Sequence, residues 1–424
     1  MKKLFARFLI NYKTQNQKDE SFHKLKKNFE IEKIFNAFSN FNQNSEIRYV
    51  GGCVRKILNK EVVDDIDFAV NINPTDVKQC LKNNNIEFFE TGIKHGTITA
   101  RVNEKNFEIT SLRKDLNTDG RHASVSFTDN WKEDSLRRDL SINSIYADIN
   151  GNIFDPHEGV NDLKLGIVKF IGNPDERIKE DYLRILRYVI FFLLYSKSNH
   201  SDNIKRAIKQ NLDGILNLSK ERLLDEFKKI VLSKAIFKVK NDNFCLEIIL
   251  LVFPQLVNLD KLNKLTQNQE NIIWNKNFIF ILSFLIIDKS DNSDYFIYKF
   301  NLSNNAKKKI NYLKNIFGKN LEKNFFDKKN LEKIFYFDGK EVLLDIIDFH
   351  LLQLKKINKK IIELKKYFQQ KEVPKFPIKA EQIMEQFKIK EGKELGEKLR
   401  FLESLWVSNG FSISEKDIKK TFSN

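Results

Sequence analysis

The fifteen glycines of this 424-residue chain are distributed unevenly, and their distribution separates two kinds of structure. Nine of them fall between residues 50 and 172. That region also holds stretches rich in β-branched and aromatic residues, which are typical of strands: Asp65–Val70, Gly96–Val102, Asn106–Ser111 and Ile167–Ile171. Farther along, leucine, isoleucine and phenylalanine recur at helical spacing, with lysine on the other faces. We therefore predict an α+β fold, in which a head with a mixed sheet precedes an all-helical remainder.

The same composition suggests four segments. They are an N-terminal helical extension (1–45), the head (46–172), a helical neck (173–260), and a helical body and tail (261–424). The neck is expected to begin with a long helix, because Asn173 can cap it, Pro174 suits its first turn, and Glu176 completes a capping-box pattern. Pro374 and Pro377 are expected to interrupt the helices near the end of the chain.

The net charge predicts a polyanionic partner. Lysine and arginine total 73 against 57 acidic residues, a formal charge of +16. Clustered cations gain free energy by releasing counterions from nucleic acid, so RNA or DNA is the expected partner. A compositional bias toward lysine across the whole chain is the alternative explanation. No feature of the sequence predicts an oligomeric state.

The cysteines and the apolar runs bear on location. The three cysteines are scattered and form no Cys-x-x-Cys pair, which is typical of a reducing compartment. The longest apolar run, Phe278–Ile287, is too short to cross a bilayer, so no membrane partner is expected. We predict a cytoplasmic protein; the basic and apolar N-terminus leaves an organelle presequence open.

Two carboxylates indicate a metal site. Asp65 and Asp67 stand at i and i+2 in a strand-like stretch, so both side chains leave the same face. Mg²⁺ is usually held by one or two carboxylates together with the phosphates of a substrate. Because Gly51 and Gly52 precede the pair by about a dozen residues, we predict a site for Mg²⁺ and a nucleoside triphosphate.

The paired glycines predict phosphate binding. Gly51 and Gly52 let backbone N–H groups approach phosphate oxygens, and Arg55 can bind a triphosphate through its planar guanidinium. A simple strand-to-helix turn is the alternative. Glu108 lies in a neighbouring strand-like segment, where a third carboxylate can orient the metal ions or accept a proton from the attacking hydroxyl. A solvated strand glutamate is the alternative for Glu108.

Two further groups of polar residues predict nucleotide contacts. On a helix, Asp139 and Asn143 would lie one turn apart, and Arg138 with Asn143 would grip the phosphates and ribose. A doubled arginine is often only a solvated face. Asn143, however, lies in an otherwise apolar run, where a buried polar group needs a partner.

The second group predicts base selection. Asp181, Arg184 and Arg187 stand at i, i+3 and i+6 of the expected neck helix. Ionised Asp only accepts hydrogen bonds and Arg only donates them. Cytosine and adenine each present an amine donor beside a ring-nitrogen acceptor, so Asp181 and Arg184 complement both. Uracil and guanine present the reverse pattern, and each buried mismatch costs about 1–3 kcal/mol. An intrahelical Asp–Arg ion pair without a ligand is the alternative.

Taken in order, the motifs match a known family. They are Gly51-Gly52-Cys53-Val54-Arg55, Asp65-Ile66-Asp67, Arg137-Arg138-Asp139-Leu140-x-x-Asn143, Asp155-Pro156-x-x-Gly159-x-x-Asp162-Leu163, Glu180-Asp181-x-x-Arg184-x-x-Arg187 and Ser219-x-Glu221-Arg222-Leu223. Together they resemble class II tRNA nucleotidyltransferases, the CCA-adding enzymes, which share a family with bacterial poly(A) polymerases.

The resemblance implies a polymerase-β-like head followed by helical neck, body and tail domains that hold the tRNA acceptor arm. It implies Mg²⁺ on Asp65 and Asp67, and CTP and ATP as substrates selected by Asp181 and Arg184, with Arg187 as a further contact. It also implies a spring-like segment from Asp155 to Asp162. Thr118–Ala123 resembles the loop that the family needs for the final A, which favours complete CCA synthesis.

Two positions depart from the family, and the product is left open. Lys56 stands where the family usually has aspartate, which is expected to alter a turn or a salt bridge and not the metal site. Ile190 stands where some members carry another arginine. The alternatives are a poly(A) polymerase, a partial CC- or A-adding enzyme, or a non-catalytic RNA-binding protein built on an inactive head.

Overall fold

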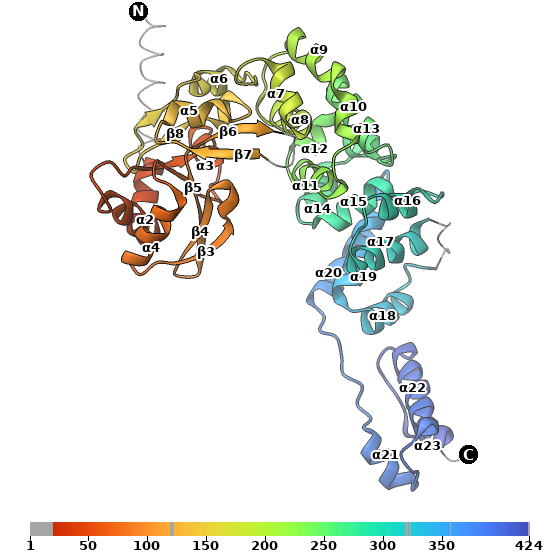
Figure 1. Ribbon diagram of the computed structural model, residues 1–424. Coiled ribbons are helices and arrows are strands. Elements are labelled where there is room, and N and C mark those ends of the chain that lie inside the picture. Colours follow the sequence, from red (N-terminus) through yellow and green to blue (C-terminus); the bar gives the residue numbers. More distant parts are fainter. Residues whose placement is uncertain (1–19, 119–122, 319–320, 322–323, 357, 423–424) are drawn as a thin grey trace, which may run out of the picture. The chain divides into compact units, whose positions relative to one another are not determined.

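The computed structural model describes residues 20–118, 123–318, 321, 324–356 and 358–422 (Figure 1). The chain divides into two compact units, Met1–Val252 and Phe253–Asn424. The first unit contains all the strands among the described residues, and the second unit is helical there. The predicted order, an α+β head followed by helices, is therefore confirmed.

A seven-stranded sheet forms the head. Its spatial order is β3-β4-β5-β2-β1-β8-β9. Strand β2 pairs with β5 in parallel, whereas the other neighbours are antiparallel, so the sheet is mixed as predicted. The strands are β1 (Ile47–Val50), β2 (Asp67–Val70), β3 (Glu87–Gly92), β4 (Thr97–Val102), β5 (Lys105–Ser111), β8 (Tyr146–Ala147) and β9 (Ile153–Phe154).

Three of the four expected strands are present, and the fourth is wrong. Residues Ile167–Ile171 form no strand; Phe170 makes a single isolated bridge with Leu140. The side chain of Phe170 is buried and stacks on Tyr188 with 5.5 Å between the ring centroids. The apolar pattern that suggested a strand comes from packing against a helix, which periodicity alone does not distinguish over so short a segment.

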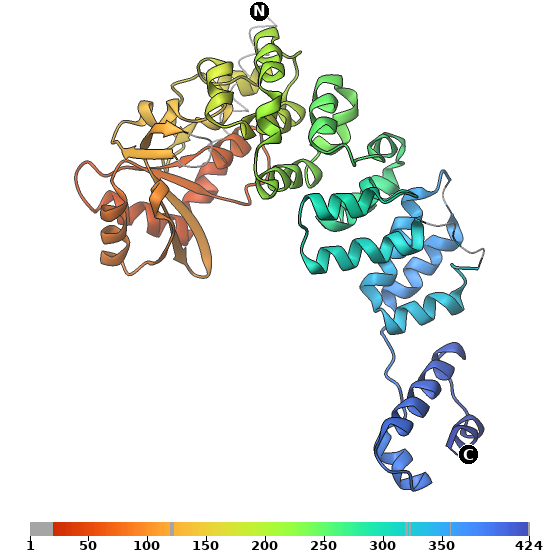
Figure 2. The ribbon, with the colours of Figure 1, turned by 45° about the vertical axis from the view of Figure 1, so that its right-hand side comes forward.

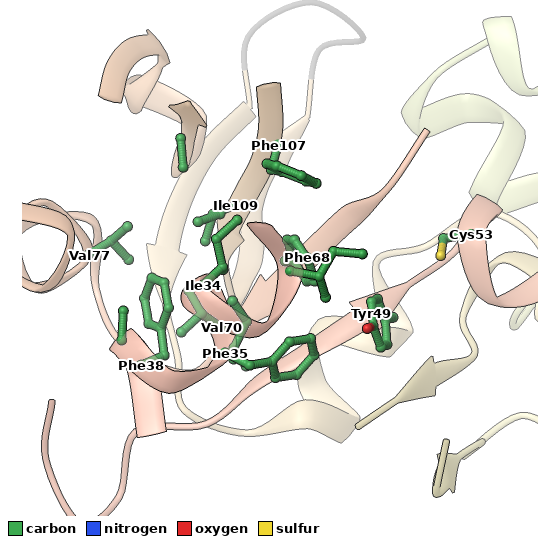
Figure 3. Packing of buried hydrophobic residues seen from close by; sticks show 14 of the residues in the cluster. Ile34, Phe35, Phe38, Tyr49, Cys53, Phe68, Val70, Val77, Phe107 and Ile109 are labelled. Atoms are coloured by element: carbon green, nitrogen blue, oxygen red, sulfur yellow. The ribbon is translucent and has the colours of Figure 1, made fainter. Parts of the chain in front are cut away.

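Helices cover both faces of this sheet. On one face, α2 (Phe29–Ser39) and α4 (Pro74–Asn83) contact each other and the strands. Figure 3 shows Phe35 of α2 against Tyr49 and Phe68, with ring centroids 4.9 Å and 5.5 Å away. On the other face, Trp131 of α5 (Trp131–Leu136) packs on Tyr146. The described part of the segment before residue 46 therefore shares the core of the head.

A separate hairpin follows β5. Strand β6 (Arg113–Thr118) pairs with β7 (Ala123–Phe127) as a two-stranded antiparallel sheet (Figures 1 and 2). The loop expected at Thr118–Ala123 joins these strands, but residues 119–122 lie outside the described residues. The remaining head helices are α3 (Gly52–Leu58) and α6 (Gly159–Leu165).

The segment resembling a spring begins with a helix cap. The carboxylate of Asp155 accepts hydrogen bonds from the backbone N–H groups of Gly159 and Val160, both at 2.8 Å. Asp162 is buried, and its carboxylate accepts a 2.6 Å bond from the Ser141 hydroxyl and pairs with Lys169 at 3.0 Å. The bonds of Asp162 fix α6 to the side chains of Ser141 and Lys169.

The expected long neck helix is wrong in one respect: it is two helices. Asn173 caps the first, α7 (Pro174–Glu180), by accepting the Asp175 N–H at 2.9 Å. The chain then turns extended at Asp181, with φ −157° and ψ 106°, before α8 (Leu183–Tyr195) begins. The Asp181 carboxylate accepts the Leu183 N–H at 3.1 Å. An aspartate that binds nearby backbone competes with helix continuation, which explains the break.

Five more helices complete the first unit. They are α9 (Asp202–Gln210), α10 (Leu212–Leu216), α11 (Lys220–Val231), α12 (Ala235–Lys238) and α13 (Asn243–Val252). Helix α8 contacts α11, α12 and α13. Its buried residues lie around almost its whole circumference, so α8 is the central helix of this group.

The second unit holds ten α-helices among its described residues, besides a 3₁₀ helix at Leu259–Lys264. They are α14 (Gln267–Trp274), α15 (Phe278–Ile286), α16 (Asn292–Lys299), α17 (Asn304–Phe317), α18 (Lys328–Phe337), α19 (Lys340–Gln353), α20 (Lys359–Gln370), α21 (Ala380–Phe387), α22 (Lys393–Ser408) and α23 (Glu415–Phe422). The expected interruption at Pro374 and Pro377 is confirmed by an extended segment between α20 and α21 (Figure 2). The apolar run that includes α15 is buried, and no helix in the described part of the chain can span a membrane.

Candidate active site

The site is built on the turn between β1 and α3. Gly51 has φ 65° and ψ −116°, a backbone conformation that L side chains rarely adopt. A Cβ at Gly51 would lie 3.4 Å from the Asn143 carbonyl oxygen and 3.6 Å from Nη1 of Arg138. The turn therefore lies against the two polar residues that were predicted to hold a nucleotide, and glycine keeps that approach open.

Three carboxylates face one another beside this turn. Asp67 opens β2 and stands directly opposite Glu108 of the parallel strand β5. Burial, together with the charges of Asp65 and Glu108, raises the pKa of Asp67 to about 6. Asp65 itself is exposed. Crowded carboxylates of this kind repel one another, so their oxygen donors fit a hard divalent cation, which would relieve the repulsion.

Glu108 does not complete a compact cage with the two aspartates. Among the described residues, the only group of three candidate ligands within 4.8 Å of one another lies elsewhere, at His200. Asp65 and Asp67 stay the predicted metal ligands, and Glu108 lies beside Asp67 on the neighbouring strand. The catalytic part assigned to Glu108 stays a prediction.

A cleft of about 430 Å³ opens between this turn and helix α8. Such a volume is typical of sites that hold a small organic ligand. It is lined by Val50, Gly51, Gly52, Arg55, Asp67, Arg113, Asp115, Arg137, Arg138, Asp139, Asn143, Asp181, Arg184, Arg187 and Phe191. Six arginines stand against four aspartates, which favours an anion. All the residues predicted to bind the nucleotide line this one cleft; their individual roles stay predictions.

Asp139 and Asn143 meet, although not on a helix. The expected helix is wrong, because Leu140 is extended and Ser141–Asn143 form one 3₁₀ turn. The Asn143 amide still donates to the Asp139 carboxylate at 3.2 Å, and Arg55 donates to the Asn143 oxygen. The other Asp139 oxygen pairs with Arg187 at 3.0 Å.

This network fixes the charge of Asp139. Burial alone would raise the pKa of Asp139, but Arg187 and the hydrogen bonds from Leu140 and Asn143 lower it below its usual value. An ionised aspartate therefore joins Arg55, on α3, to Arg187, on α8; Asn143 bridges it to Arg55. This network therefore fixes the positions of the two sides of the cleft relative to each other.

Asp134 is a site residue that the sequence interpretation missed. Its side chain is buried and binds Arg137 at 2.8 Å, Arg138 at 3.2 Å and the Tyr146 hydroxyl at 2.6 Å. Despite burial, the two arginines lower the pKa of Asp134 to about 2. The i+3 and i+4 spacing from Asp134 to Arg137 and Arg138 was the available signal.

Three residues that line the cleft, unlike Asp134, were also missed. Arg113 begins β6, and burial together with the charge of Arg137 lowers its pKa to about 10. Asp115 lies two residues farther along the same strand, 3.7 Å from Arg113. Phe191 faces the Arg55 guanidinium, which lies 4.6 Å from the ring centroid. No local motif marks these residues, because the β6–β7 hairpin and α8, which carry them, come together only in the folded chain.

The two residues predicted to read the base are held by neighbours. The Asp181 carboxylate pairs with Arg222 of α11 at 2.8 Å. Arg184 is buried; it donates to the carbonyl oxygens of Arg177 at 2.8 Å and Arg137 at 3.3 Å, and it pairs with Glu180. Asp181 and Arg184 thus do not pair with each other in the described contacts, in contrast to the ion-pair alternative.

The two departures from the family pattern have local explanations. Lys56 pairs with Asp64, next to Asp65, and its charge acts to lower the pKa of Asp67. Lys56 therefore makes a salt bridge, as expected, and also partly offsets the crowding of the carboxylates. Ile190 is buried within α8 and does not line the cleft.

Comparison with known proteins identifies the family. Residues 47–169 match the model of the poly A polymerase head domain. Over 398 residues the chain is 34% identical to CCA tRNA nucleotidyltransferase 1, mitochondrial, of Mus musculus, covering 89% of this chain and 88% of the mouse protein. The chain belongs to the CCA tRNA nucleotidyltransferase family. The resemblance inferred from the motifs is confirmed, and the chain is a nucleotidyltransferase of this family.

Other members of the CCA tRNA nucleotidyltransferase family are also similar to this chain. The CCA-adding enzyme of Lactobacillus helveticus is 35% identical over 187 residues, 44% of this chain and 46% of that enzyme. The crystal structure of the Bacillus stearothermophilus CCA-adding enzyme in complex with CTP matches with a TM-score of 0.66 and 20% identity, covering 92% of this chain and 95% of that one. The structural match shows that the fold is shared.

Proposed function

We propose that this protein adds C, C and A to the 3′ end of tRNA, using CTP and ATP and no nucleic-acid template. The observation that carries the proposal is the single cleft that holds Asp67, the glycine turn and the Asp181–Arg184 pair. Metal-binding, phosphate-binding and base-reading groups within one cleft are what a self-contained nucleotidyltransferase needs. The mouse and human relatives carry the name of this activity.

Magnesium is the proposed metal, and Asp65 with Asp67 would hold it. When bound, it supplies electrostatic stabilisation of the attacking hydroxyl and of the leaving pyrophosphate. The protein's own contribution is to position the substrates. The turn at Gly51 and Gly52 lets phosphate oxygens approach the backbone, and Arg55 and Arg138 present cationic groups from two sides of the cleft.

Base selection is assigned to Asp181 and Arg184. A carboxylate offers about four lone-pair sites, of which Arg222 and the Leu183 N–H occupy two in the described contacts. Arg184 has five N–H donors, and its hydrogen bonds to Arg177, Glu180 and Arg137 occupy three. Acceptors and donors therefore remain for a base, while the existing bonds hold both side chains in orientation.

The decisive experiment incubates the full chain with a tRNA transcript that lacks its 3′ end. CTP, ATP or both are supplied with Mg²⁺, and product length is read on a sequencing gel. Three added nucleotides with both substrates, and two with CTP alone, are expected. Asp67→Ala should lower incorporation by about 10³-fold, because a metal contributes several kcal/mol and each 1.4 kcal/mol changes the rate tenfold. Normal incorporation by that variant would refute the assignment.

The alternatives give different products in the same assay. A poly(A) polymerase would extend a generic RNA with ATP alone into long tails, and a partial enzyme would stop after CC or add only A. A non-catalytic RNA-binding protein would retain tRNA in a filter-binding assay without extending it. Asp181→Ala tests selectivity: incorporation of UTP and GTP should rise relative to CTP, while tRNA binding stays unchanged.

The compartment stays a proposal. The three cysteines, Cys53, Cys80 and Cys245, are free and buried, which suits a reducing compartment such as the cytoplasm. The mouse and human relatives are mitochondrial by name, and residues 1–19, which would carry a presequence, lie outside the described residues. Fusing residues 1–45 to a fluorescent protein and imaging it in the native cell separates the two locations.

A further inference from the structure

A compact cluster of potential metal ligands lies in the first unit, and none of its members lines the nucleotide cleft. His200 stands in the connection from α8 to α9, Asp242 directly precedes α13, and Cys245 lies in the first turn of α13. Cys245 is fully buried, and His200 and Asp242 are partly buried. We call these three residues the His200 cluster. In the part of the chain that the structure describes, it is the only group of three such ligands within 4.8 Å.

The distances fit a tetrahedral ion. Nε2 of His200 lies 3.0 Å from Oδ2 of Asp242 and 3.9 Å from Sγ of Cys245. Zinc bonds of about 2.0–2.3 Å, arranged tetrahedrally, separate neighbouring ligand atoms by about 3.3–3.6 Å. The two observed distances lie on either side of that range. Movements of a few tenths of an ångström would therefore place all three atoms around one ion.

The surroundings orient the ligands. Nδ1 of His200 lies 2.8 Å from the Tyr188 hydroxyl, which leaves Nε2 to face Asp242 and Cys245. A metal-bound histidine almost always has such a partner on its other ring nitrogen. The His200 ring also stacks on Phe192, with centroids 3.5 Å apart. Oδ1 of Asp242 accepts the Cys245 N–H at 2.8 Å and also lies 3.1 Å from Nε2 of His200, so Oδ2 is the less occupied oxygen and the one we assign to a ligand bond.

A hydrogen-bonded histidine without a metal is the competing explanation. Asp242 and Tyr188 would satisfy both ring nitrogens of His200, and the Cys245 thiol would share a side-chain hydrogen bond with Asp242. The thiol at 3.9 Å makes at most a weak hydrogen bond, yet it is directed at the same nitrogen as the carboxylate. A metal ion explains why sulfur, nitrogen and oxygen converge on one point.

We propose that His200, Asp242 and Cys245 bind one Zn²⁺ ion. The thiolate and imidazole donors favour zinc over magnesium or calcium, which prefer oxygen ligands throughout. Three protein ligands leave a fourth position for water. Because the cluster lies apart from the nucleotide cleft, its role is structural: the ion joins the α8–α9 connection to the start of α13. The proposal is independent of the proposed function.

The test measures metal in the purified full chain. After dialysis against Zn²⁺ and removal of the excess, plasma mass spectrometry should find about one Zn²⁺ per chain. Replacement by Co²⁺ should give a thiolate-to-cobalt charge-transfer band in the near ultraviolet. Both signals should be lost in Cys245→Ser and kept in Cys80→Ser, a matched control, since Cys80 is also buried but lies in the head core.

Two more variants keep the result interpretable. Tyr188→Phe should still bind zinc but about 10–100-fold more weakly, because it removes only the partner of Nδ1. If Cys245→Ser does not fold by circular dichroism, Asp242→Asn, of nearly equal volume, replaces it. Equal zinc in the wild type and a folded ligand variant, or cobalt binding without a charge-transfer band, would overturn the proposal. Loss of zinc binding without loss of CTP incorporation supports it.

Discussion

Replacing Asp67 by asparagine should stabilise the metal-free protein while abolishing catalysis. The folded-state pKa of Asp67 is about 6, against 3.8 for an ordinary aspartate, because of burial and the neighbouring carboxylates. A raised carboxyl pKa means that the folded state disfavours the ionised form. The full shift corresponds to about 3 kcal/mol at 1.36 kcal/mol per pH unit. Because Asp67 is partly exposed, solvent screening reduces the expected gain to about 1–2 kcal/mol.

The gain should depend on pH in a defined direction. Between pH 3.8 and about 6 the folded state binds more protons at Asp67 than the unfolded state, so this group makes wild-type stability fall as pH rises. The Asp67→Asn variant does not lose stability in this way as pH rises, because asparagine does not ionise. The stability difference between variant and wild type should therefore be absent below the unfolded pKa, grow as pH rises, and be complete above about pH 6.

The assay is thermal unfolding of the full chain in chelator, followed by scanning calorimetry or fluorescence from pH 4 to 8. A gain of about 1–2 kcal/mol should raise the melting temperature by roughly 2–8 °C for a unit of this size. Added Mg²⁺ should stabilise the wild type more than the variant, because only the wild type keeps the ligand pair. Asp129→Asn, a change at an exposed carboxylate in the loop before α5, is the control. An unchanged or lower melting temperature for metal-free Asp67→Asn would refute the reasoning.

Three further substitutions test the supporting structure. Asp134→Asn should cost about 3–5 kcal/mol in urea unfolding at pH 7, because it removes a buried anion and leaves two partly buried arginines without it. Since the folded pKa of Asp134 is lowered to about 2, the difference from wild type should shrink as pH falls from about 4 toward 2, and a constant difference would contradict this. Gly159→Ala should cost about 1–3 kcal/mol in the same assay, because a Cβ there would lie 2.1 Å from the Ser141 carbonyl oxygen. Gly396→Ala, on open helix α22 with only an arginine nitrogen 3.8 Å away, should instead stabilise by about 0.5–1 kcal/mol, and a loss would show that the space is misjudged.

Much of the cleft could be predicted because its residues lie in short motifs. The doubled glycine, the two aspartates and the Glu-Asp-x-x-Arg segment each carry their chemistry within a few residues. Local spacing was enough to place Asp65 and Asp67 beside one strand and Asp181 near Arg184. The mixed sheet and the helical remainder followed from glycine content and periodicity in the same way.

What failed depended on tertiary contacts. Asp181 ends one helix, and its carboxylate accepts the Leu183 N–H at the start of the next, a backbone preference that helical periodicity does not reveal. Ile167–Ile171 was taken for a strand because a short apolar run looks the same against a sheet or a helix. Arg113, Asp115 and Phe191 enter the cleft from elements far apart in the chain, and the His200 cluster joins residues more than forty positions apart. No local pattern encodes either arrangement.

The packing of α2 has a practical consequence for dissecting this enzyme. The family match begins at residue 47, which invites truncation there. Such a fragment would lack Ile34, Phe35 and Phe38, which are buried against the sheet, and Phe22, which covers Gly151. The exposed strands would then present a large apolar surface that promotes aggregation. A minimal catalytic fragment should begin no later than residue 20. Poor yields from shorter fragments would reflect loss of the helix that covers the sheet and not loss of a catalytic residue.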